Sequence, residues 1–145
     1  MPHQINIFIE NRPGRLRSIT EILTEAKVNI RAFTIQDRGD FGLIKLIVDK
    51  PKQGQLALAD RQFACALKDV LAVSIPDRPG NLHKLTSVFF EHNINIVDAY
   101  GFVLEPNKEG VCCIEFENAE DLERCKALVV KEGFKVLEDE ELYEF

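Results

Sequence analysis

The chain has 145 residues, of which 46% are hydrophobic and 29% are charged. This length suits one ordinary domain or two small ones, and the composition is that of a soluble globular protein. The formal net charge of -6 argues against nucleic-acid binding, which needs a basic face, and no stretch reaches the roughly 20 apolar residues that span a bilayer.

The N-terminal residues alternate between apolar and polar side chains and do not form the apolar run of a signal peptide. The four cysteines lack the spacing of a disulfide framework. We therefore expect a cytoplasmic protein with no membrane partner.

The first half of the chain alternates between strand and helix patterns. Alternating apolar residues predict a strand over 4–10, and a stripe formed by Leu16, Ile19 and Leu23 predicts a helix over 15–26. Strands are expected at 29–37 and 41–48, the second of them central because it is almost continuously apolar. A short helix over 51–61 and a strand over 63–68 complete this half.

The second half follows the same order. We expect a strand over 70–76, a helix over 79–91, strands over 94–104 and 111–116, a helix over 119–132 and a strand over 134–138. Asn93 stands where a helix often ends on a left-handed residue. The acidic residues 139–141 are interpreted as a solvated end.

The two halves are copies of one module. Asn11-Arg12-Pro13-Gly14 returns 66 positions later as Asp77-Arg78-Pro79-Gly80, and Val28-Asn29-Ile30 returns as Ile94-Asn95-Ile96. The predicted modules span 1–68 and 69–145, and each has the order βαββαβ. This order predicts an α+β fold of two tandem ferredoxin-like modules, each an antiparallel four-stranded sheet with both helices on one face.

The repeated Pro-Gly turn joins a strand to a helix. Pro13 and Pro79 suit the first helical position, and Asn11 and Asp77 are placed to cap the free helix amides. Gly14 and Gly80 lack a β-carbon, so another group can approach the backbone closely. Free amides at a helix N-terminus favour a bound anion.

The chemistry of an enzyme is not apparent in the chain. No nucleophile–base set is recognisable, and His83 and His92 lack the spacing of paired metal ligands. Cys112 and Cys113 are neighbours on a strand and should point to opposite faces. Phosphate-binding loops and the basic-aromatic signature of RNA-binding sheets are also missing. We expect no catalysis, no metal and no cofactor.

The turn, the helix stripe and the Asn-Ile pair together resemble the ACT domain, as two copies that cover nearly the whole chain. ACT domains have the βαββαβ fold and bind amino acids as regulatory modules. The chain also resembles small stand-alone proteins built from two ACT domains, whose C-terminal Leu-Tyr pair is matched by Leu142 and Tyr143.

The resemblance implies where a ligand would bind. In the ACT domain of phosphoglycerate dehydrogenase the effector lies between two modules, held by an Asn of the turn and by the Asn that opens the second strand. A His two residues before the turn is also used there, but Ile9 and Ile75 occupy that position here, which weakens any carry-over of serine specificity. The candidate ligand-binding residues are Asn11, Pro13, Gly14, Leu16, Asn29, Ile30, Asp77, Pro79, Gly80, Asn81, Leu82, Asn95 and Ile96.

Four functions fit these observations. The first is a non-catalytic regulatory protein that binds amino acids at module interfaces and acts through a homodimer or a partner. The second is a regulatory small subunit of an amino-acid biosynthetic enzyme, similar to that of acetolactate synthase, with a catalytic partner enzyme. The third is an enzyme, and the fourth is a dimerisation module whose turns are empty.

Overall fold

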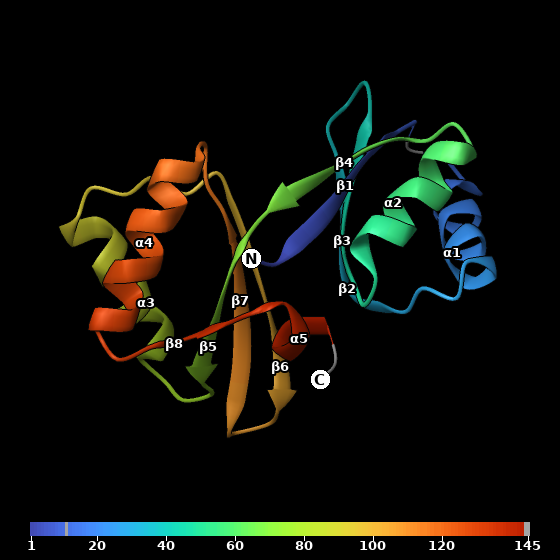
Figure 1. Cartoon of the computed structure of the whole chain (residues 1–145). Helices are drawn as coiled ribbons and strands as arrows, with labels where there is room; N and C mark the ends of the chain where they lie inside the picture. Colours follow the sequence, from blue (N-terminus) through green and yellow to red (C-terminus); the bar gives the residue numbers. More distant parts are fainter. Residues whose placement is uncertain (11, 144–145) are drawn as a thin grey trace. The chain divides into compact units, whose positions relative to one another are not determined.

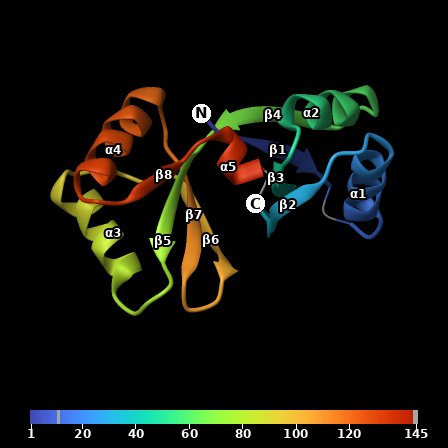
Figure 2. The ribbon, with the colours of Figure 1, turned by 60° about the horizontal axis from the view of Figure 1, so that its bottom comes forward.

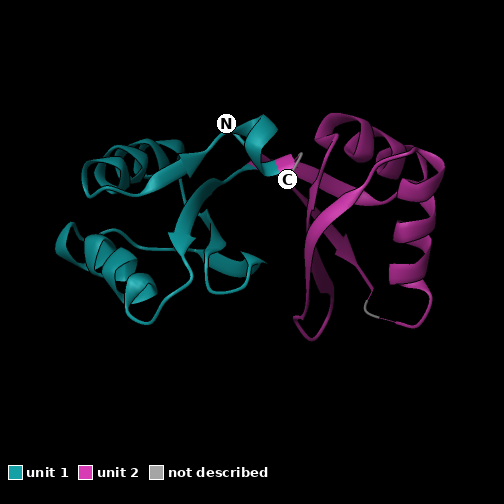
Figure 3. Cartoon of the chain, turned by 90° about the horizontal axis from the view of Figure 1, so that it is seen from below, with its two compact units in different colours: residues 1–2, 69–142 teal, residues 3–68, 143–145 magenta. Residues whose placement is uncertain are grey.

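A computed structural model describes residues 1–10 and 12–143. The chain divides into two compact units (Figure 3), and the boundary in the middle of the chain falls between Lys68 and Asp69. We call residues 3–68 with Tyr143 the first module, and residues 69–142 with Met1 and Pro2 the second module.

Both modules have the predicted βαββαβ order (Figure 1). The elements of the first module are β1 (His3–Ile9), α1 (Arg15–Glu25), β2 (Ile30–Asp37), β3 (Gly42–Val48), α2 (Pro51–Asp60) and β4 (Ala64–Asp69). Those of the second module are β5 (Leu71–Pro76), α3 (Asn81–Glu91), β6 (Asp98–Glu105), β7 (Glu109–Glu115), α4 (Ala119–Lys131) and β8 (Lys135–Leu137), followed by the short α5 (Asp139–Tyr143).

Each module forms one four-stranded sheet with its two main helices on one face (Figure 2). The strand orders are β2-β3-β1-β4 and β6-β7-β5-β8, so β2 and β6 are end strands of their sheets. In β3, which lies between β2 and β1, all seven residues are buried, as its continuous apolar sequence predicted. The predicted α+β ferredoxin-like fold is confirmed.

The core of the first module lies between the sheet and its helices. Ile5 and Ile7 of β1 pack there with Ile19 and Leu23 of α1. Gly54 of α2 is buried in this layer, and a β-carbon added to it would lie 3.2 Å from Ile5 Cδ1 and 3.3 Å from Leu23 Cδ2. Glycine therefore allows α2, which has few large apolar residues, to approach β1 and α1 closely.

Two predicted elements differ in the structure. Strand β6 begins at Asp98 and not at Ile94, because Ile94 still belongs to the end of α3: its amide donates to Phe89 O at 2.9 Å and its side chain is buried. The acidic residues 139–141 begin a short helix, α5, that was not predicted, although Glu140 and Glu141 are exposed as expected. There Glu141 forms an ion pair with Lys135.

Candidate ligand-binding site

The two Pro-Gly turns have the same backbone geometry. Gly14 (φ 93°, ψ -18°) and Gly80 (φ 91°, ψ -16°) are the N-cap residues of α1 and α3. The prolines therefore precede the N-cap, and the prediction that they occupy the first helical position is wrong. A positive φ is readily adopted only by glycine, so it is the backbone conformation that requires glycine at both turns.

Each turn leaves helix amides that point out of the N-terminus. The first intrahelical bonds are Ser18 N to Gly14 O at 3.0 Å and Lys84 N to Gly80 O at 2.9 Å. Of the amides before Ser18 and Lys84, those of Arg15 and Asn81 donate to Arg12 O and Arg78 O at 3.3 Å. The next two amides of each helix have no acceptor four residues back in the helix. Such amides, together with the positive end of the helix dipole, favour an anion.

The capping role predicted for Asp77 is not found. Among the described residues, no side chain caps the N-terminus of α3. The Asp77 carboxylate instead accepts a 2.8 Å hydrogen bond from the amide of Asn107, which lies in the β6–β7 turn. Its counterpart Asn11 lies outside the described residues.

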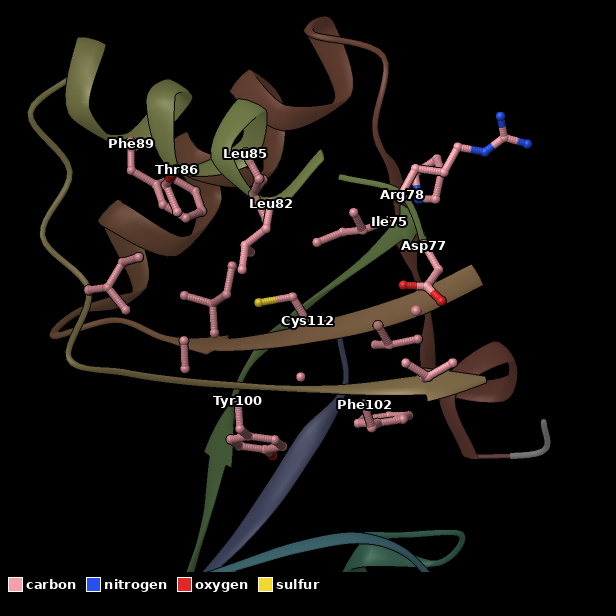
Figure 4. Close-up of a pocket in the computed structure, with 18 residues that line it drawn as sticks. Ile75, Asp77, Arg78, Leu82, Leu85, Thr86, Phe89, Tyr100, Phe102 and Cys112 are labelled. Atoms are coloured by element: carbon pink, nitrogen blue, oxygen red, sulfur yellow. The ribbon is translucent and has the colours of Figure 1, made fainter. Parts of the chain in front are cut away.

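A pocket of about 490 Å³ lies in the second module between α3 and the end strand β6 (Figure 4). Leu82, Leu85, Thr86 and Phe89 line it from α3, and Cys112 lines it from β7. The part formed by β6 includes Ala99, Gly101 and Val103, which are exposed. The volume falls within the range of small-molecule sites.

Asp77 supplies a carboxylate to the wall of this pocket, at the end where β5 leads into the turn. Arg78 also belongs to the lining, but its guanidinium extends away from the pocket (Figure 4). Tyr100 and Phe102 point away from α3, to the other side of β6. The pocket is thus mainly apolar, with a carboxylate at one end.

The first module has a smaller pocket at the equivalent place, between α1 and β2, with a volume of about 330 Å³. Six lining positions correspond through the repeat: Leu16 and Leu82, Ile19 and Leu85, Thr20 and Thr86, Ile30 and Ile96, Phe33 and Ala99, and Leu46 and Ile114. The duplication therefore produces two related pockets, one beside each Pro-Gly turn.

The profile of a family described as ACT domain pair matches residues 1–145. The chain belongs to this family. The resemblance to tandem ACT domains predicted from the sequence is therefore confirmed, and the two modules are ACT modules.

Solved structures agree with this assignment. A protein from Bacteroides thetaiotaomicron is 30% identical, with a TM-score of 0.90 over 99% of this chain and 96% of that one. The regulatory subunit of aspartate kinase from Thermus thermophilus, in its ligand-free form, is 17% identical, with a TM-score of 0.65 over 91% and 93% of the two chains. The same subunit from Thermus flavus is also 17% identical, with a TM-score of 0.59 over 90% and 92%. These last two show the fold alone. No match was found among curated proteins.

The two ACT pockets include some of the predicted site residues. Leu82, Ile96 and Asp77 line the pocket of the second module, and Leu16 and Ile30 line that of the first. The remaining described candidates, which are Pro13, Gly14, Asn29, Pro79, Gly80, Asn81 and Asn95, are not among the lining residues of either pocket.

The two strand asparagines lie apart from the pocket walls for local reasons. The amide of Asn29 donates to Asp49 Oδ1 at 2.8 Å, which ties it to the end of β3. Asn95 is exposed and precedes β6 by three residues. It therefore does not open a strand, contrary to the prediction from the sequence.

Sequence reasoning also missed residues that line the pockets. Thr20 and Thr86 are 66 positions apart and line equivalent positions, a signal that the repeat already contained. Phe33 and Ala99 are also 66 positions apart, but they differ in type, so the repeated pattern does not mark them; the strand register places them at equivalent positions.

Cys112 contributes an uncharged wall to the second pocket. Burial raises the pKa of its thiol to about 11, so near neutral pH it is protonated and behaves as a small apolar group. Cys113, on the opposite face of β7, is also buried, and its pKa is raised to about 12 for the same reason. These thiols are poor candidates for nucleophiles.

Residues 1–10 and 12–143 contain neither a metal-binding cluster nor a membrane-spanning helix. Within that part of the chain, His, Cys, Asp and Glu residues form no group of three or more that could hold a metal ion. Among the same residues, no helix combines the length and apolar character needed to cross a membrane.

Proposed function

We propose that this ACT domain pair is a non-catalytic regulatory protein that binds a free amino acid in a pocket beside its Pro-Gly turn. The observation that carries the proposal is the recurrence of the pocket, in both copies, between the first helix of the module and the end strand of its sheet. Both pockets have volumes within the range of small-molecule sites.

The groups around the second pocket suit a zwitterion. The outward-pointing amides at the start of α3 can bind an α-carboxylate. Asp77 lines the same pocket and offers a carboxylate to an α-ammonium group. One hydrogen bond to Asp77 is already made by Asn107, through Oδ2, and a carboxylate can accept several. Donors and acceptors are therefore available at the end of the pocket that adjoins the turn.

Thermal denaturation with each of the twenty amino acids tests this proposal. An amino acid that binds only the folded chain raises the melting temperature, and at 100 times its dissociation constant it adds about 2.7 kcal/mol to the free energy of unfolding. Calorimetric titration then gives the affinity and the number of sites. The N-acetyl and methyl-ester derivatives of the same amino acid are the matched controls, since each lacks one of the two charges.

Two results would contradict amino-acid binding. One is the absence of any shift with all twenty compounds. The other is equal binding of the doubly blocked derivative, because that result would mean that the two charges are not recognised.

We further propose that the protein acts through assembly, as a homodimer or with a partner enzyme. Strands β2 and β6 are end strands, and β2 carries Phe33 and Ile35, whose side chains are 58% and 43% exposed. An exposed, apolar end strand favours pairing with another chain. The similarity of fold to regulatory subunits of aspartate kinase is compatible with a catalytic partner.

Sedimentation velocity over a range of concentrations, with and without the amino acid found by the thermal screen, tests this assembly. A dimer that tightens with ligand is expected if the ligand binds near the paired edges. Purification of a tagged copy from its native host, followed by mass spectrometry, distinguishes a dimer alone from a complex with an amino-acid biosynthetic enzyme.

A further inference from the structure

The two pockets differ at the positions contributed by their end strands. Phe33 of β2 pairs with Leu46, and the equivalent Ala99 of β6 pairs with Ile114. Two residues along, Ile35 pairs with Ile44, and Gly101 pairs with Cys112. At each of these end-strand positions the second module has the smaller residue.

These smaller residues lie next to one another on the face that carries the helices. Directly opposed residues of an antiparallel pair point to the same face, and Cys112 and Ile114 belong to the core beneath α3. Ala99 and Gly101 therefore also lie on the α3 side of β6. Ala99 and Gly101 are separated by one residue, so they are neighbours on this face of β6. Because both residues are small, the space above them is continuous.

The linings show the effect of this difference. In the first module the end-strand residues that line the pocket are Ile30 to Phe33, and of residues 9, 10, 12 and 13, which the structure describes, none takes part. In the second module the lining continues past Ala99 to Val103 and reaches Pro76, Asp77 and Arg78. The apolar space and the carboxylate of Asp77 thus belong to one cavity only in the second module.

We propose that the second module is the specific site for an amino acid with a large apolar side chain, and that Ala99 and Gly101 determine this preference. This inference rests on the proposed function. The α-ammonium group would lie at Asp77, and the side chain would extend between α3 and β6 toward Leu85, Phe89 and Cys112, which are apolar or uncharged. In the first module Phe33 lines the smaller pocket of about 330 Å³, and Ile35 lies beside it on the same face of β2. These larger residues narrow the corresponding space, so the large ligand binds once per chain.

Apolar contact sets the expected trend. Each buried methylene group contributes about 0.8 kcal/mol, or about fourfold in affinity. Calorimetric titration with alanine, 2-aminobutyrate, norvaline and norleucine should therefore show affinity that rises by about fourfold with each methylene group, at a stoichiometry of one per chain. Aspartate and lysine should bind weakly.

Ala99→Phe tests the assignment, because it gives the second module the residue that the first module already accepts at the same register position. It should remove the dependence on side-chain length and weaken norleucine binding at least tenfold. Phe33→Ala, the reverse exchange in the other module, should leave the affinity for norleucine at the second module unchanged. Gly101→Ala, whose β-carbon would lie 3.4 Å from Val111 O, is a milder second variant that should weaken norleucine more than alanine. Urea unfolding of each variant verifies that it is folded.

The outcomes separate the two proposals. If some amino acid binds but affinity does not rise with side-chain length, or if folded Ala99→Phe and Gly101→Ala both bind norleucine as tightly as the wild type, the specificity proposed here is wrong while amino-acid binding stands. If Phe33→Ala weakens norleucine as much as Ala99→Phe does, the site lies elsewhere. If no amino acid binds the wild type, the proposed function fails and this inference fails with it.

Discussion

The phenol oxygen of Tyr143 accepts a 2.7 Å hydrogen bond from the backbone amide of His3, joining residues that lie 140 positions apart. The Tyr143 side chain is only 8% exposed, and both residues belong to the first module. The last residue of α5 therefore belongs to the first module and contacts the start of β1. This contact gives a structural reason for the Leu-Tyr pair near the C-terminus.

Tyr143→Phe should lower the free energy of unfolding by about 1 kcal/mol, because it removes the acceptor while keeping the buried ring. Equilibrium unfolding in urea measures the change. Glu140→Gln, an exposed substitution in the same helix, is the control and should alter stability by less than about 0.5 kcal/mol. An unchanged urea midpoint for Tyr143→Phe would mean that water accepts the hydrogen bond of the His3 amide with no loss of stability.

Much of the fold could be predicted because the patterns that specify it are local and occur twice. The alternation of Ile5, Ile7 and Ile9 and the stripe of Leu16, Ile19 and Leu23 each identify an element and its buried face. The start of β6 could not be placed as well, since an apolar residue such as Ile94 fits both a strand and the closing turn of a helix. The hydrogen bond from the Ile94 amide to Phe89 O shows that Ile94 closes the helix and does not begin the strand.

The candidate site was predicted less completely, because a pocket depends on residues from different elements. The turns were identified from their repeated sequence, but Ala99 and Gly101 look unremarkable in a strand. They become informative only when the register sets them opposite Ile114 and Cys112. Asp77 does not cap α3 as expected, because its carboxylate accepts a hydrogen bond from the backbone amide of Asn107, thirty positions away.

The role of glycine in the turns can be tested by a matched pair of substitutions. Gly80 and Gly133 have φ values of 91° and 93°, and within the described structure a β-carbon added to either would have no neighbour within 4 Å. Gly80→Ala and Gly133→Ala should each cost about 1 kcal/mol or more, because an L-residue is strained in this conformation. Asparagine at either position should cost less. Urea unfolding provides the comparison.

Ligand binding separates these two glycines. Gly80 lies at the N-terminus of α3, whereas Gly133 follows α4. Only Gly80→Ala should reduce affinity for an amino acid, since only this substitution alters the turn beside the pocket. Equal affinities for the two folded variants would mean that the turn conformation does not contribute to binding.

The ion pair between Lys126 and Glu138 predicts a dependence of stability on pH. Lys126 Nζ donates to Glu138 Oε1 at 2.8 Å, and this hydrogen bond holds the pKa of the Glu138 carboxyl below its ordinary value of 4.5. A carboxyl group whose pKa is lower in the folded state stabilises that state above the unfolded pKa. This stabilisation is lost as the pH falls through the folded pKa.

Lys126→Met should therefore lower the free energy of unfolding near pH 6, and its difference from the wild type should shrink as the pH falls below about 4.5. The effect is small because the Lys126 and Glu138 side chains are 30% and 51% exposed, and added salt should reduce it. Lys131→Met, in the last turn of the same helix, is the control. A difference that persists unchanged at low pH would assign the effect of Lys126 to packing.

Asp77 has two roles that can be separated by substitution. Its Oδ2 atom holds the amide of Asn107 at 2.8 Å, and its carboxylate also lines the pocket of the second module. Asp77→Asn keeps an oxygen that can accept the hydrogen bond from Asn107 but removes the charge. Asp77→Ala removes both. The first variant should therefore unfold within about 0.5 kcal/mol of the wild type, whereas the second should lose about 1 kcal/mol.

Binding of the amino acid found by the thermal screen should respond to charge alone. Hydrogen bonds to charged groups contribute about 1.5–3 kcal/mol, so Asp77→Asn should weaken binding by at least about tenfold, measured by calorimetric titration. Glu105→Gln removes a charge of the same sign from the neighbouring β6–β7 hairpin, outside the pocket lining, and should change affinity little. If Asp77→Asn and Glu105→Gln bind the ligand equally well, the carboxylate of Asp77 does not recognise the α-ammonium group. If Asp77→Asn is also as stable as the wild type, the role of Asp77 would be only to hold the amide of Asn107 in the β6–β7 turn.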